Sequence, residues 1–292
     1  MTDRAQAGAA LKHLLTVEEL DTDLYRGTFD ASVPGRMFGG QVIAQALAAA
    51  VASIGDERVA HSLHAYFLRA GDNTRPVIFR VIRDFDGGTF ANRRVVALQD
   101  GKPILNLATS FQKREEGLSH AVPMPGVPGP EEAVPLMDLL GQSGDKLPPP
   151  IAQLLGAFDM RGGTRDAQGC GDQGGTIGLP TQHSWLRLDE ALGGDLGRIA
   201  LAYASDFGLI TTAMLPHGLQ WFSPEIQGAS LDHTIWFHED PPVGEWLLYM
   251  MDTPWSGLGR GFARGSVFNR SGRLIASVAQ EGLMRRRPQP VA

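Results

Sequence analysis

The chain has 292 residues but a single cysteine, Cys170. One cysteine excludes a disulfide within the chain and favours a reducing compartment, so we expect a cytoplasmic location. The first residues lack the apolar segment of a secretory signal. No run of about 18 consecutive apolar residues is present either, so the sequence predicts no transmembrane segment.

Positive charge is also scarce. Lysine and arginine number 26 against 32 acidic residues, which gives a formal net charge of −6. This balance argues against a nucleic-acid partner and against binding to an anionic membrane. Hydrophobic residues make up 43% of the chain and charged residues 20%, which is typical of a globular protein.

Several sequence motifs of enzymes are missing. The chain has no G-x-S-x-G, no H-E-x-x-H and no C-x-x-C, so the patterns of a nucleophile elbow, a zinc protease and a redox pair are absent. The G-x-G-x-x-G match at residues 169–174 has no strand before it and no helix after it. None of these motifs therefore indicates a metal or a cofactor.

Proline and glycine divide the chain into three parts. Residues 114–180 are rich in both, as in "VPMPGVPGPEE" and "GCGDQGG". Residues 1–113 and 181–292 instead show strand and helix patterns. Because so long a connection inside one domain is unusual, we predict two domains joined by a linker over 114–180.

The two outer parts resemble each other. "VVALQDGKPILNLATSFQ" at 95–112 corresponds to "SVFNRSGRLIASVAQEGL" at 266–283, and each has a hairpin signal, Asp100-Gly101 and Ser271-Gly272. A helical pattern precedes the strands in both parts, over residues 39–55 and 195–215. This order favours a duplicated α+β unit, although chance similarity between two hairpins is the alternative.

Two polar side chains lie where apolar ones are expected. In the predicted strand 274–284, Gln280 interrupts an otherwise apolar face, so its amide requires either a structural partner or a ligand. Asp206 shares the apolar side of the second helix with Tyr203 and Ile210. If Asp206 has no functional role, its carboxylate would either pair with an arginine or face water at the edge of the helix.

The segment "GASLDHTIWFHED" contains Ser230, Asp232 and His233, which together suggest a catalytic triad. In a regular strand, Ser230 and His233 would point to opposite faces and could not bond to each other. We therefore do not predict a nucleophilic serine, and the residues alone favour a structural role for Ser230.

An ordered set of segments resembles the acyl-CoA thioesterase II family over most of both halves. The segments are "FGGQVIAQAL", "HSLHAYFLRAGD", "GKPILNLATSFQ", "YASDFGL", "LDHTIWFH", "EWLLY" and "GFARGSVFNRSGRLIASVAQEGLMR". The resemblance implies a double hotdog, in which each of two fused domains is a long helix wrapped by an antiparallel sheet. It also implies hydrolysis of fatty acyl-CoA to free fatty acid and CoA, without a covalent intermediate, metal or cofactor.

The resemblance further implies that Asp206, Ser230 and Gln280 are the catalytic residues and position a water molecule. Asp206 would be the general base. Gln280 is neutral, so its role would be to orient the water or to polarise the thioester carbonyl. Ser230 would orient by hydrogen bonding; the family often has threonine there, and we expect activity to survive with serine. The first-half helix carries no matching carboxylate, so we expect that only the second half is catalytic.

Two other functions are weighed against this one. A hotdog acyl-CoA hydratase or dehydratase would carry a D-x-N-P-x-H segment, which is absent. A non-catalytic acyl-CoA-binding module is the second alternative. In all three cases acyl-CoA is the expected partner, and an open sheet edge favours a homo-oligomer.

Overall fold

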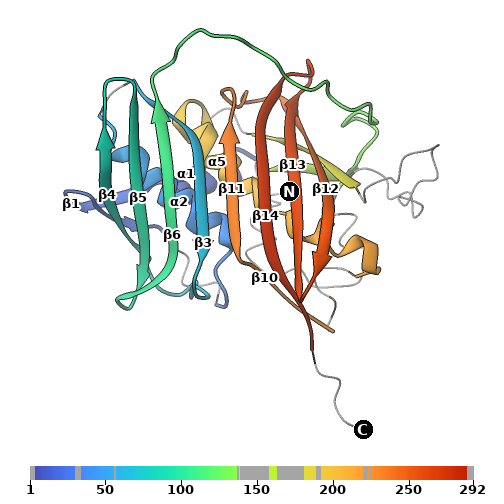
Figure 1. Ribbon diagram of the computed structural model, residues 1–292, viewed down its shortest axis with the longest axis horizontal. Coiled ribbons are helices and arrows are strands. Elements are labelled where there is room, and N and C mark those ends of the chain that lie inside the picture. Colours follow the sequence, from blue (N-terminus) through green and yellow to red (C-terminus); the bar gives the residue numbers. More distant parts are fainter. Residues whose placement is uncertain are drawn as a thin grey trace.

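The computed structural model describes residues 4–29, 34–55, 57–136, 138, 158–162, 181–188, 192–219, 223 and 225–287. Cys170 and the glycine-rich match at 169–174 lie outside these residues, so the expectations attached to them stay predictions. The described residues form one large antiparallel sheet and a few helices (Figure 1).

The first half contains two helices, α1 (Arg4–Leu15) and α2 (Gly39–Ala52), with its first two strands between them in the chain. Its strands are β1 (Val17–Asp21), β2 (Leu24–Gly27), β3 (Val59–Phe67), β4 (Ile78–Asp86), β5 (Phe90–Gln99) and β6 (Lys102–Gln112). The predicted helix over 39–55 is confirmed as α2. The hairpin at Asp100-Gly101 is also confirmed, because both residues have positive φ, 48° and 72°, as a tight turn requires.

The second half contains helices α5 (Asp195–Ser205) and α6 (Leu209–Thr212), and the 3-10 turn η2 (Leu215–His217). Its strands are β9 (Thr181–Arg187), β10 (Ile226–Ser230), β11 (Asp232–Phe237), β12 (Trp246–Gly257), β13 (Arg260–Asn269) and β14 (Leu274–Arg286). The β13–β14 hairpin predicted at Ser271-Gly272 is confirmed, with Gly272 at a φ of 85°.

The predicted linker contributes two strands to the sheet. Within residues 114–180, β7 (Val134–Pro135) and β8 (Asp159–Gly162) form, and β8 pairs with β9 at the sheet edge. The segment before β7 also contacts the second half, since the indole of Trp185 donates a hydrogen bond to Pro128 O at 3.0 Å. These parts of the connection therefore pack against the second half.

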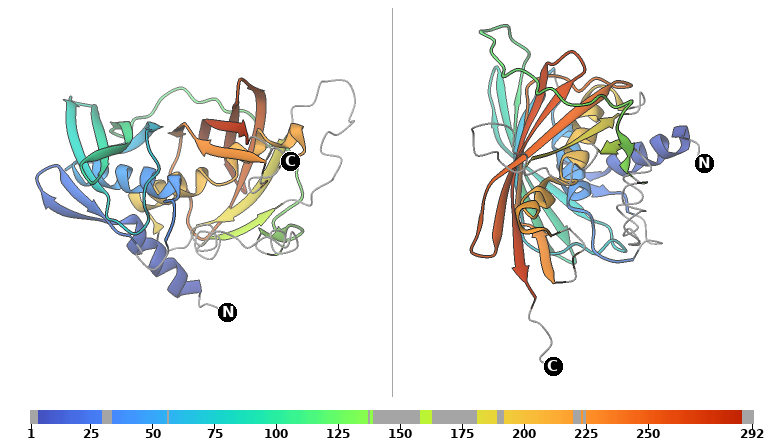
Figure 2. Two further views of the ribbon diagram at one scale, coloured as in Figure 1. Left: turned by 90° about the horizontal axis from the view of Figure 1, so that it is seen from below. Right: turned by 90° about the vertical axis from the view of Figure 1, so that its right-hand side faces the viewer.

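The sheet follows the order β1-β2-β4-β5-β6-β3-β11-β14-β13-β12-β9-β8-β7, and β10 pairs with β14. The two halves join in its middle, where Ser62–Tyr66 of β3 pair antiparallel with Asp232–Trp236 of β11. All helices described lie on one side of this sheet (Figure 2). The sheet is thus continuous through both halves.

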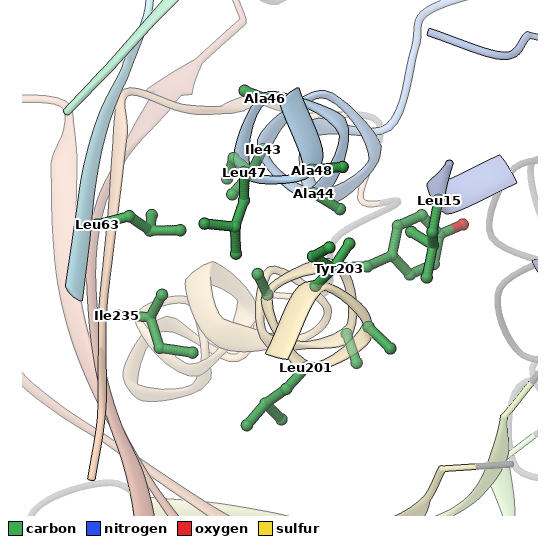
Figure 3. Packing of buried hydrophobic residues seen from close by; sticks show 14 of the residues in the cluster. Leu15, Ile43, Ala44, Ala46, Leu47, Ala48, Leu63, Leu201, Tyr203 and Ile235 are labelled. Atoms are coloured by element: carbon green, nitrogen blue, oxygen red, sulfur yellow. The ribbon is translucent and has the colours of Figure 1, made fainter. Parts of the chain in front are cut away.

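Helices α2 and α5 pack against each other beneath the central strands. Figure 3 shows Leu47 of α2 and Tyr203 of α5 in the same cluster as Leu63 and Ile235, which project from β3 and β11. Both helices are buried over nearly their whole circumference because each contacts the other helix as well as the sheet.

The second helix differs from its prediction. The pattern over 195–215 predicts one helix, but α5 ends at Ser205 and α6 begins at Leu209. Gly208 has a φ of 80°, a left-handed conformation that interrupts the helix. Asp206 is therefore the residue that caps the end of α5.

The same region bears on the expectation that no segment spans a membrane. By length and composition alone, Asp195–His217 is long and apolar enough to cross one, a possibility that the search for an unbroken apolar run missed. In the structure 72% of its apolar window is buried within the fold, as in a core helix of a globular protein.

Candidate active site

Three side chains from three elements meet at one carboxylate oxygen. Gln280 Nε2, on β14, donates a hydrogen bond to Asp206 Oδ1 at 2.5 Å. Ser230 Oγ, at the end of β10, donates to the same oxygen at 3.3 Å. The structure therefore brings together the three residues predicted from the sequence, hereafter the candidate site.

The candidate site is largely closed to solvent. Asp206 is 7% exposed and Gln280 is 1% exposed. Gln280 lies on the inner face of β14, as its alternation predicts. Its Oε1 atom is buried and accepts no hydrogen bond from the described residues, so the amide keeps one free acceptor beside the carboxylate.

His233 corrects one part of the sequence interpretation. Ser230 and His233 do not point to opposite sides, because both approach Asp206; His233 Nδ1 lies 3.9 Å from Asp206 Oδ1. The reason is a register shift: Ser230 pairs with Gly282, whereas Thr234 pairs with Ala279. The break between β10 and β11 changes the alternation that a regular strand would keep.

Even so, these residues do not form a serine-nucleophile triad. Ser230 Oγ donates its proton to Asp206 rather than to His233. His233 Nε2 instead lies 2.9 Å from Ser205 Oγ, which itself donates to Ala202 O. Complete burial lowers the pKa of His233, and nearby Asp206 opposes this only in part, so the imidazole is neutral at neutral pH.

A further layer of contacts holds the end of α5. Tyr249 OH, on β12, donates a hydrogen bond to Ser205 O at 2.9 Å. Burial, together with Asp206, raises the pKa of Tyr249, so the phenol remains a donor. This bond satisfies a carbonyl in the last turn of the helix next to Asp206.

The first half supplies the other wall of the site. A Cβ added to Gly39 would lie 2.8 Å from Asp206 Oδ2, and one added to Gly40 would lie 2.3 Å from Tyr203 O. The start of α2 therefore touches the end of α5, which requires glycine at both positions. The first N–H groups of a helix lack partners within it and favour negative charge nearby.

Sequence reasoning did not single out Gly39, Gly40 or His233 as parts of the site. The Gly-Gly pair at the start of an apolar helix was a usable signal, because glycine there indicates close approach of another backbone. His233 carried no such signal, since only the register shift brings it to Asp206.

The first half has a different set of side chains at the corresponding place. Ser53 caps α2 as Asp206 caps α5, and Thr109 aligns with Gln280 in the sequence repeat. Arg93 is 2% exposed and donates to Ser53 Oγ at 2.9 Å. A buried arginine occupies this place, in agreement with the expectation that the first half lacks the carboxylate.

Among the residues that the structure describes, no group of three or more His, Cys, Asp or Glu side chains could hold a metal ion. The groups beside the Asp206 carboxylate are instead the neutral imidazole of His233, the amide of Gln280 and the hydroxyl of Ser230.

Comparison with known proteins places this arrangement in a family. The model of the acyl-CoA thioesterase N-terminal domain matches residues 29–112, and that of the acyl-CoA thioesterase C-terminal domain matches residues 130–284. The chain therefore belongs to the acyl-CoA thioesterase family.

Individual relatives cover nearly the whole chain. Acyl-coenzyme A thioesterase 8 of Homo sapiens is 36% identical over 94% of this chain and 89% of its own length. An acyl-CoA thioesterase II from Mycobacterium marinum has a TM-score of 0.78 at 34% identity, covering 95% of this chain and 98% of that one.

A third comparison concerns the fold alone. A protein of unknown function with a hot dog fold from Alicyclobacillus acidocaldarius has a TM-score of 0.73 at 19% identity, covering 96% of this chain and 99% of that one. The antiparallel sheet around buried helices is thus a hot dog fold.

Proposed function

We propose that this protein hydrolyses fatty acyl-CoA to free fatty acid and CoA, and that its two halves are fused hotdog domains. Family membership supports the reaction, since relatives that cover most of the chain are named acyl-CoA thioesterases. The observation that carries the mechanism is the buried Asp206 carboxylate, which accepts hydrogen bonds from Ser230 and Gln280.

In the proposed reaction Asp206 takes a proton from a water molecule while the water oxygen bonds to the thioester carbonyl carbon. The C–S bond then breaks, and the proton passes to the CoA sulfur. Ser230 and Gln280 orient the carboxylate, and the free Gln280 Oε1 is available as an acceptor for the water. No covalent bond forms between protein and acyl group.

Negative charge develops on the carbonyl oxygen during this attack and requires donors. We assign that role to the first-turn N–H groups of α2, because Gly39 lies directly against Asp206. The first half would then complete the catalytic centre of the second half without supplying a base of its own.

The domain boundaries also belong to this proposal. Residues 1–113 and 181–292 would be the two domains and 114–180 the connection, part of which extends the sheet as β7 and β8. The cytoplasmic location, the homo-oligomer and the lack of nucleic-acid and membrane partners stay predictions.

The reaction is tested by following thiol release from a series of acyl-CoAs of increasing chain length. We expect turnover by the wild-type protein and a fall of about 10²-fold or more in kcat for Asp206→Asn, which removes the general base but keeps the shape. Folding of the variant is checked by its thermal unfolding.

The alternatives give different outcomes in the same assay. Wild-type turnover that Asp206→Asn leaves unchanged would move the chemistry away from this carboxylate. Stabilisation by CoA without thiol release would favour the binding module, and addition of water to an enoyl-CoA would favour a hydratase.

A further inference from the structure

The three elements that carry the candidate site continue to the same end of the fold. Ser230 pairs with Gly282, and four residues away Ile226 pairs with Arg286. Figure 1 shows β10 beside the C-terminal end of β14. Helix α6 follows Asp206 along the chain and contacts β12, β13 and β14, and His217 Nε2 of η2 lies 2.7 Å from Ser256 Oγ of β12. At this end lies a pocket of about 190 Å³, whose lining includes His217, Leu219, Ile226, Met284 and Arg286.

Between the candidate site and this pocket, α6 lies almost on the backbone of the sheet. A Cβ added to Gly282 would be 2.3 Å from Ile210 Cδ1, and a Cβ added to Gly261 would be 2.4 Å from Met284 Sδ. Because both positions are glycine, no side chain projects from the sheet there. The side-chain ends of Ile210 and Met284 pack directly on its backbone. The backbone oxygen of Ala229 also lies 3.3 Å from the Cβ position at Gly282, so side chains and one carbonyl close the path here.

The path begins at the amide of Gln280. Gly282 and Met284 follow it on the same face of β14, at about 7 Å and about 14 Å for a strand rise of roughly 3.4 Å per residue. An extended acyl chain starting at the site would therefore meet Ile210 first and Met284 later.

We propose that this path is the acyl-chain subsite and that Ile210 and Met284 determine how long an acyl chain the enzyme accepts. The inference rests on the proposed function, because it places the thioester carbonyl beside Asp206 and Gln280. An apolar path suits a hydrocarbon better than the pantetheine arm of CoA, whose amide groups would be buried there without partners. Methionine is suited to such a barrier because its side chain adapts readily to its surroundings.

The test compares kcat/KM for lauroyl-CoA and butyryl-CoA in the wild type and in Met284→Ala. Shortening the side chain gives room to additional methylene groups, so the lauroyl-to-butyryl ratio is expected to rise about tenfold or more. Ile210→Val, a milder change in case the first variant does not fold, is expected to raise the ratio roughly threefold.

Met160→Ala is the matched control, because Met160 is a buried methionine in β8, on a strand that pairs with β7 and β9 rather than with β14. The lauroyl-to-butyryl ratio of kcat/KM in Met160→Ala should equal that of the wild type. A ratio that stays unchanged in folded Met284→Ala or Ile210→Val would overturn the acyl-chain subsite. A wild-type protein that hydrolyses neither substrate would instead contradict the proposed function itself.

Discussion

Gln280 shows how much one residue out of pattern can indicate. Its amide interrupts an apolar strand face, and the physical cost of burying it alone predicts a partner. The partner is Asp206, at 2.5 Å, which is itself a polar residue on an apolar helix side. Each residue was recognisable separately, but no periodicity in the sequence shows that the two form a pair.

The neutral state of His233 leads to a prediction about stability and pH. Its pKa is lowered by burial, whereas in an unfolded chain it is about 6.5. Below about pH 6.5 the unfolded chain binds a proton that the folded one does not, so stability falls as pH falls. Burial also lowers the pKa values of His61, His183 and His238, which act in the same direction.

We therefore expect the free energy of unfolding to be highest above about pH 6.5 and to decrease as the pH falls below that value. His233→Gln, which keeps a group able to reach Ser205, should reduce the steepness of that decrease. Urea unfolding at several pH values and constant ionic strength measures it. An equally steep decrease in the variant would show that His233 does not contribute.

At the scale of elements, the decisive contact is between the start of α2 and the end of α5. Each helix is predicted by its apolar spacing, and α2 agrees with its prediction. The predicted second helix was too long because Gly208, at a φ of 80°, ends the regular structure after Asp206. The carboxylate lies against α2, where Gly39 leaves room for it and Gly40 leaves room for the backbone of Tyr203.

Gly40→Ala tests this contact. The new methyl would lie 2.3 Å from the backbone oxygen of Tyr203, so the helices must separate. We expect a loss of about 1–3 kcal/mol in the free energy of unfolding, together with reduced kcat. Gly117→Ala is the control, because nothing lies within 4 Å of a Cβ added at Gly117. Equal stability of the two variants would contradict close packing at Gly40.

At the scale of the whole molecule, the two halves share a sheet and a core. β3 and β11 pair along the junction, and α2 and α5 pack in one cluster. Each half therefore needs the other to cover its apolar helix face and to pair its central strand. In the proposed double hotdog, one half takes the position that a second subunit would occupy in a dimer of single domains.

A fragment of residues 1–113 should therefore not persist as a folded monomer. It would expose the edge of β3 and the face of α2 that α5 covers, and an unpaired edge promotes association. We expect a dimer or larger assembly by size-exclusion chromatography with light scattering. A monomeric fragment with cooperative thermal unfolding would show that the first half is independent of the second.

The sequence by itself determined the two hairpins and α2, and it marked Asp206 and Gln280 as polar residues out of pattern, because local periodicity and the cost of burying polar groups act on neighbouring residues. Ser230 was indicated only by the family resemblance. The tertiary structure decided what depends on separate segments: the continuous sheet, the two strands within the predicted linker, and the wall that α2 forms at the site. It also decided the position of His233, since a register shift between β10 and β11 arises from pairing with β14 and leaves no periodic trace in the chain.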